Sequence, residues 1–89
     1  SYGFNEPGGI ASGGNHIWVA NYSGDSVTEL SASTGALVRV IRGSSYGFDG
    51  PDAVASGGTH VWVANQFGNS VTELSASTGA LVKVIGGSS

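Results

Sequence analysis

The stretch HIWVAN at residues 16–21 returns as HVWVAN at residues 60–65, a shift of 44 positions. Each copy places a tryptophan among β-branched and small residues, a composition that favours strands. The same shift aligns the rest of the chain with itself, and only 12 of the 44 aligned pairs differ, at residues 5, 6, 8, 9, 10, 15, 17, 22, 23, 25, 39 and 42 of the first copy. A repeat of this length predicts two tandem supersecondary units, residues 1–44 and 45–89.

Four strands are predicted in each unit, because short β-favouring runs alternate with glycine-containing connections of hairpin length. In the first unit the runs are GGIAS, HIWVAN, SVTELS and ALVRVI, at residues 8–12, 16–21, 26–31 and 36–41. No segment has the periodicity and caps of a helix. The expected fold class is all-β, with two four-stranded antiparallel meanders joined by the segment RGSSYGFDGP.

The connection STG at residues 33–35 predicts how the third and fourth strands pair. We interpret it as a three-residue hairpin loop with Gly35 in the left-handed conformation. That loop places three pairs of residues opposite one another: Val27 and Ile41, Glu29 and Arg39, and in the second unit Glu73 and Lys83. Both charged pairs are complementary, which favours the register.

Both faces of each predicted sheet carry apolar residues. A sheet with one face in water alternates apolar and polar side chains, so this pattern indicates sheets that are covered on both sides. Together with four strands and a period of 44, it points to the blades of a β-propeller. The residues expected to pack between blades are Trp18, Trp62, Ile17, Val61, Val19, Val63, Leu30 and Leu74.

The two tryptophans have an alternative interpretation, as a stacking platform for a sugar or a base. Val19 and Ala20 follow Trp18 and offer no polar partner to such a ligand. We therefore expect Trp18 and Trp62 to pack between blades, with a hydrogen-bond acceptor for each indole N–H.

Four blocks recur in the same order in each unit: Pro-x-x-Ile/Val-Ala, His-x-Trp-Val-Ala-Asn, Ser-Val-Thr-Glu-Leu and Thr-Gly. Their arrangement resembles the blades of YVTN and NHL repeat β-propellers. WVAN at residues 18–21 and 62–65 stands where that family has Tyr-Val-Thr-Asn. The resemblance covers nearly the whole chain, and it implies a propeller fold and a binding or scaffold role more than a particular activity.

A propeller closes with about four to eight blades, and this chain supplies two. Two bare apolar faces are unusual on a monomer, so we expect homo-oligomerisation to complete the ring through a heterologous contact. A homotrimer with six blades is favoured, because six-bladed rings are common among the NHL-type relatives that the sequence resembles. A homotetramer with eight blades is the alternative. The joint between subunits is expected to bring residues 85–89 next to residues 1–4 of the next chain.

Composition excludes several classes of partner. Charged residues are 10% of the 89-residue chain and the net charge is −3, with no cluster of positive charge to contact nucleic acid. There is no cysteine for disulfides or thiolate ligands, and no apolar run long enough to span a membrane. No cofactor is expected. Because neither a signal peptide nor an initiator methionine is visible, we expect a processed, excised or engineered chain, and no compartment is indicated.

No arrangement of residues predicts catalysis or metal binding. Each unit has one histidine without a second ligand at motif spacing, so His16 and His60 are expected to bond a turn or a neighbouring blade. Glu29 and Glu73 have basic partners across the hairpin, which predicts solvated ion pairs and not catalytic carboxylates. No catalytic triad is ordered by the sequence, and the chain is not expected to be an enzyme.

The differences between the copies define a candidate ligand surface. Seven of them fall at residues 5, 6, 8, 9, 22, 23 and 25, in loops that meet on one rim of a propeller. The candidate rim residues are Tyr2, Glu6, Asn21, Tyr22, Asp25, Asp49, Asp52, Asn65, Gln66 and Phe67. Drift of exposed loops after duplication is the simpler explanation. The favoured function is a structural or interaction module that assembles with itself; the alternative is a lectin-like propeller with a small glycan ligand.

Overall fold

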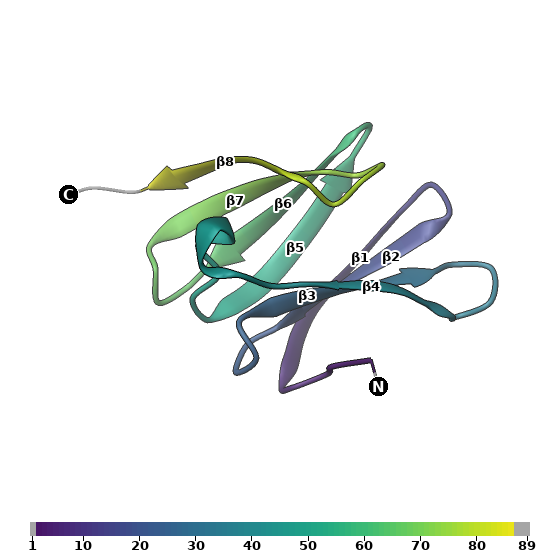
Figure 1. Cartoon of the computed structure of the whole chain (residues 1–89), viewed down its shortest axis with the longest axis horizontal. Helices are drawn as coiled ribbons and strands as arrows, with labels where there is room; N and C mark the ends of the chain where they lie inside the picture. The colour runs from purple at the N-terminus through teal and green to yellow at the C-terminus, as the bar shows by residue number, and fades with distance from the viewer. Residues whose placement is uncertain (1, 87–89) are drawn as a thin grey trace.

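The chain folds into two four-stranded antiparallel sheets, each a meander in sequence order (Figure 1). The computed structural model describes residues 2–86, apart from the side chain of Ser44. The first sheet contains β1 (Pro7–Gly13), β2 (His16–Asn21), β3 (Ser26–Ser31) and β4 (Leu37–Ile41). The second contains β5 (Pro51–Gly57), β6 (His60–Asn65), β7 (Ser70–Ser75) and β8 (Leu81–Gly86). The all-β prediction and the order of the strands are confirmed.

The segment between the sheets contains a short element that the sequence pattern did not predict. It is a single turn of 3₁₀-helix, η1 (Ser44–Tyr46), which lies near β8 (Figure 1). Of the predicted joint between subunits, residues 1 and 87–89 lie outside the described residues.

The hairpins use the turn chemistry that their residues favour. Asp25 and Asn69 occupy the same position in the β2–β3 and β6–β7 turns, with φ of 48° and 50°. Aspartate and asparagine tolerate this left-handed conformation better than other residues with a Cβ. Gly35 has a φ of 76°, as the three-residue loop requires, and its N–H donates to the Ser31 carbonyl at 2.8 Å.

The predicted strand register is confirmed at all three pairs. Val27 lies opposite Ile41, and the two acidic residues lie opposite their basic partners on the neighbouring strand. An irregularity between Glu29 and Leu30 then shifts the register, so that Leu30 pairs with Leu37. Its equivalent recurs in the second sheet.

Each sheet has two distinct faces, which we name by their residues in β2 and β6. The tryptophan face carries Trp18 or Trp62, and the valine face carries Val19 or Val63, because successive side chains of a strand point to opposite sides. The tryptophan face of the first sheet packs on the valine face of the second. This contact contains the buried core, made by Trp18, Val27, Ile41, Phe48, Val61, Val63 and Leu74.

Candidate functional site

The contact between the two sheets, here called the internal joint, shows which faces fit together. Trp18 is 1% exposed, and the residues that surround it come from the second sheet and the segment before it. Val61, Val63 and Leu74 in that sheet are completely buried. Three of the four predicted packing residues of the second sheet therefore lie in this joint.

Backbone contacts bring the edge strands β1 and β5 side by side in the internal joint. The Ser56 hydroxyl donates a hydrogen bond to the Ser12 carbonyl at 2.6 Å. A Cβ added to Gly9 would lie only 2.9 Å from the Cα of Ala53, which is closer than real Cβ contacts. Gly9 thus allows the close approach of the two strands.

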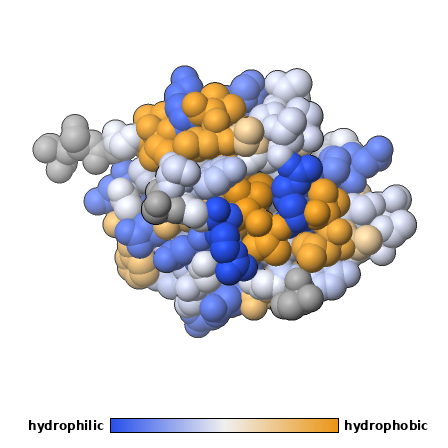
Figure 2. All heavy atoms as spheres, in the orientation of Figure 1, coloured by the Kyte–Doolittle hydropathy of each residue, from blue (hydrophilic) through white to orange (hydrophobic). Residues whose placement is uncertain are grey.

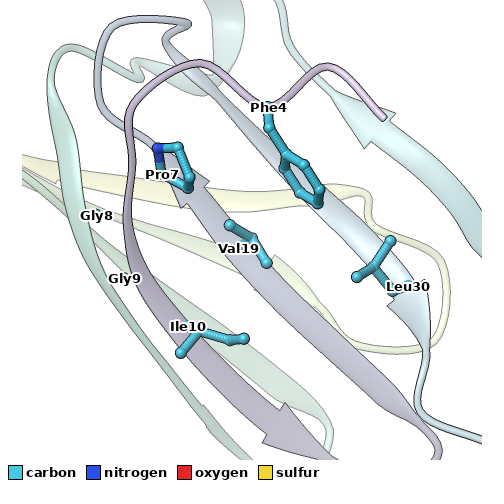
Figure 3. A pocket seen from close by; sticks show the side chains of 7 residues that line it. All are labelled: Phe4, Pro7, Gly8, Gly9, Ile10, Val19 and Leu30. Carbon is cyan, nitrogen blue, oxygen red and sulfur yellow. The ribbon is translucent and has the colours of Figure 1, made fainter. Parts of the chain in front are cut away.

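The valine face of the first sheet remains open and is hollowed. A hollow of about 400 Å³ lies between the segment before β1 and the strands, and is lined by Phe4, Pro7, Gly8, Gly9, Ile10, Val19 and Leu30 (Figure 3). Ile10 is 69% exposed. Ile17 shares this face, since it pairs with Leu30. The predicted packing residues Ile17, Val19 and Leu30 therefore belong to this face, where Val19 is buried and the other two are half-buried in the single chain.

The tryptophan face of the second sheet is open as well. Trp62 is 38% exposed there, and lines a shallow hollow of about 250 Å³ with Ala53, Val54, Ala55, Ala64 and Val71. Its counterpart Trp18 is buried. In the single chain the expected packing of Trp62 between blades is thus not made.

Exposed apolar side chains continue to the outer strands. Figure 2 shows them gathered over β4 and over β8 on the face that is drawn. They are Leu37 and Val38 in β4, and Val82, Val84 and Ile85 in β8.

The predicted solvated ion pairs are wrong for the glutamates. Glu29 is fully buried, with Oε2 at 2.6 Å from His16 Nδ1 and Oε1 at 3.0 Å from Arg39 Nε. It lies opposite Trp18 on β2, on the face that the internal joint covers. Burial raises the pKa of Glu29, and the charges of Arg39 and His16 oppose this rise.

The second sheet repeats this arrangement on its open face. Glu73 is buried, with Oε2 at 2.5 Å from His60 Nδ1 and Oε1 at 3.9 Å from Lys83 Nζ. Each histidine therefore contacts a glutamate of its own sheet, and not a turn or a neighbouring blade as expected. The signal for this contact was the combination of strand spacing and register. The histidine shares a face with the tryptophan two residues later, and the glutamate lies opposite that tryptophan on the next strand.

The expected acceptor for the Trp18 indole is not found. Its Nε1 is buried and has no hydrogen-bond partner in residues 2–86. Removal of this side chain would therefore also remove an unpaired polar group.

Three candidate rim residues are not on the rim. Asn21 and Asn65 are buried: Asn21 Nδ2 donates to Ser26 Oγ at 3.1 Å and to Thr28 Oγ1 at 3.0 Å, and Asn65 repeats these contacts. The Tyr2 hydroxyl donates to the carbonyl of Gly35, in the β3–β4 turn at the other end of the sheet. Asparagine side chains in these strands thus bind the blade together, because buried amides need partners.

The remaining rim residues are at or near the surface, and several contact one another. Tyr22 and Phe67 meet edge to face with ring centroids 5.3 Å apart, and Phe67 is 62% exposed. Glu6 accepts a hydrogen bond from the Ser23 hydroxyl. Asp49 and Gln66 are exposed and Asp52 is half-buried.

One rim contact that crosses the internal joint was not predicted. Asp25 in the β2–β3 turn accepts a hydrogen bond from the Gly50 N–H at 2.9 Å. The only available signal was that residues 25 and 6 both differ from their counterparts, residues 69 and 50.

Within residues 2–86 no three His, Cys, Asp or Glu side chains gather in a way that could hold a metal ion. The same part of the chain has no helix of the length and apolar character needed to span a membrane.

Comparisons with known proteins support the fold. No protein-family model matches the chain, and no relative is found among curated proteins. A chain of hydrazine synthase from Kuenenia stuttgartiensis is similar over 93% of this chain, with a TM-score of 0.81 and 24% identity. A chain of a nidogen/laminin complex is similar over 91%, with a TM-score of 0.74 and 16% identity. This chain spans 24% and 30% of those two chains. Both are known β-propeller folds, and the two four-stranded sheets of this chain are consistent with two propeller blades.

Proposed function

We propose that this chain is a non-catalytic interaction module that assembles with copies of itself into a closed β-propeller. The observation that carries the proposal is the identity of the two open faces. The chain leaves open one valine face and one tryptophan face, and the internal joint is made by one face of each kind. Docking the second sheet of one subunit on the first sheet of the next would bring together the same two kinds of face. Ala53 would stand in that joint where Gly9 stands in the internal joint, so its edge strands would lie farther apart than β1 and β5 do.

The residues of the open hollow correspond to those that enclose Trp18. Phe4, Val19 and Leu30 are the counterparts of Phe48, Val63 and Leu74, all buried in the internal joint. Trp62 of the neighbouring subunit would therefore occupy the hollow as Trp18 occupies its own site. Each buried CH₂ group contributes about 0.8 kcal/mol, so burying these faces favours assembly.

The contact is heterologous, since it joins different surfaces of two subunits, and such a contact forms a ring when the rotation closes. We propose a homotrimer with six blades, with a homotetramer of eight blades as the alternative. When every tryptophan face of the ring packs on a valine face, no apolar face remains open.

Ile10→Ser tests this proposal with little disturbance of the single chain, because Ile10 is exposed in the hollow. Phe67→Ser is the matched control: Phe67 is similarly exposed but lies on the rim, and serine stands at the corresponding residue 23. Light scattering should show that the wild type and the control are both assembled. The assembly of the Ile10→Ser chain should dissociate at a protein concentration more than tenfold higher than that at which the wild type dissociates. Equal dissociation of Ile10→Ser and wild type would contradict docking at this face.

A glycan-binding propeller is the second candidate, favoured by the exposed Phe67 ring beside Tyr22. A glycan array would test it. Specific binding that is lost in the Tyr22→Ala and Phe67→Ala variants would support a lectin, and binding to no glycan would leave the interaction module.

A further inference from the structure

Four of the rim residues that differ between the two copies contact one another across the internal joint. At the internal joint Asp25 accepts the hydrogen bond from Gly50 N–H. Phe67 covers Gly50 so closely that a Cβ there would lie 2.6 Å from Phe67 Cδ2. Tyr22 in turn packs on the Phe67 ring. A glycine, an aspartate and two aromatic rings thus form one cluster.

The proposed joint between subunits would bring together the other set of residues. Replacing each member of the cluster by its counterpart, 44 positions away, gives Asn69 for Asp25, Gln66 for Tyr22, Glu6 for Gly50 and Ser23 for Phe67. Glu6 and Ser23 are already hydrogen-bonded within the first sheet. The second sheet of the neighbouring subunit would contribute the two amides.

We propose that Asn69 and Gln66 of one subunit hydrogen-bond Glu6 and Ser23 of the next, and that these residues determine how subunits join. The proposal rests on the self-assembly described above. An amide both donates and accepts, so it can bond a carboxylate and a hydroxyl. An aspartate at residue 69 would instead place a second carboxylate beside Glu6.

In both joints, the residue opposite a carboxylate carries no negative charge. The aspartate stands opposite Gly50, which has no side chain, and the asparagine stands opposite a glutamate. Among these four positions, each joint therefore contains a single carboxylate.

Asn69→Asp tests the proposal directly. The backbone tolerates it, because Asp25 adopts almost the same φ at the equivalent position. Two unit charges at about 4 Å repel by about 1 kcal/mol in water and by more near a protein surface, so the dissociation constant of each joint should rise about tenfold at low salt. Added salt should reduce the effect, since it screens exposed charges.

Two further variants complete the experiment. Asn69→Asp combined with Glu6→Gln should restore the wild-type dissociation constant, because the carboxylate again faces an amide. Asp25→Asn is the matched control in the internal joint and should leave dissociation unchanged. Analytical ultracentrifugation at low and high salt measures all four chains, with circular dichroism to verify folding.

The outcomes separate the two proposals. An assembled wild type whose dissociation is unchanged by Asn69→Asp, or not restored by Glu6→Gln, overturns the rim pairing and leaves the self-assembly standing. A monomeric wild type overturns both.

Discussion

Truncation of the two tryptophans should have different consequences, although they occupy the same position in the repeat. Trp→Ala in a core costs about 3–5 kcal/mol. The unpaired indole N–H of Trp18 returns about 1–3 kcal/mol of this when it is removed, so Trp18→Ala should destabilise the chain by about 2 kcal/mol, the difference between the two midpoints. Trp62 is already 38% exposed in the single chain. Its truncation should therefore cost less within the chain and act mainly on assembly.

Urea unfolding at several protein concentrations distinguishes the two effects, because only an assembled state gains stability with concentration. Between about 1 and 100 µM, the loss of stability in Trp62→Ala should increase with concentration as the wild type assembles. The loss of unfolding free energy that Trp18→Ala causes in the internal joint should be the same at every protein concentration. Equal losses for the two variants at the lowest concentration would refute the reasoning, since the model of one closed and one open face requires them to differ.

Three further predictions concern single positions. Gly9→Ala should destabilise the chain, because its Cβ would lie 2.9 Å from the Cα of Ala53. Ala53→Gly adds no Cβ and should cost only the roughly 0.5–1 kcal/mol that glycine costs within a strand. Thermal unfolding compares them, and a melting temperature of Gly9→Ala equal to or above that of Ala53→Gly would contradict the close approach. Because burial raises the pKa of Glu29 above 4.5, folding favours the protonated form of its carboxyl. The difference between the unfolding free energies of the wild type and Glu29→Gln (wild type minus variant) should therefore rise as the pH falls from about 7 to about 4.5. A decrease of this difference would show that the ion pairs outweigh burial. Asn21→Ala leaves Ser26 and Thr28 without their buried donor and should cost about 1–3 kcal/mol in urea unfolding, whereas less than about 0.5 kcal/mol would assign the amide no structural role.

Local sequence was sufficient for the strands and most of their register. The repeated glycine turns and the complementary charges of Glu29 and Arg39 give the pairing without knowledge of the rest of the fold. The shifted pairing of Leu30 with Leu37 was not predictable, because it needs one irregular residue that no turn motif marks.

Burial depended on contacts that local patterns do not contain. Glu29 was expected in solvent because it has a charged partner, but its face is the one that the internal joint covers. Trp18 and Trp62 lie in nearly identical stretches, and only the presence of a second sheet beside one of them distinguishes their surroundings. Similarly, Asn21 is a candidate rim residue from the sequence, whereas its side chain turns inward to two hydroxyl groups.

The mass of the chain in solution tests the central claim most directly. Native mass spectrometry should find a single species of about 26 kDa, three times the chain mass of 8.8 kDa, stable to dilution in the micromolar range. Four chain masses would keep the self-assembly and change the ring to eight blades. A stable monomer, with Trp62 and the Ile10 hollow exposed to water, would contradict the account.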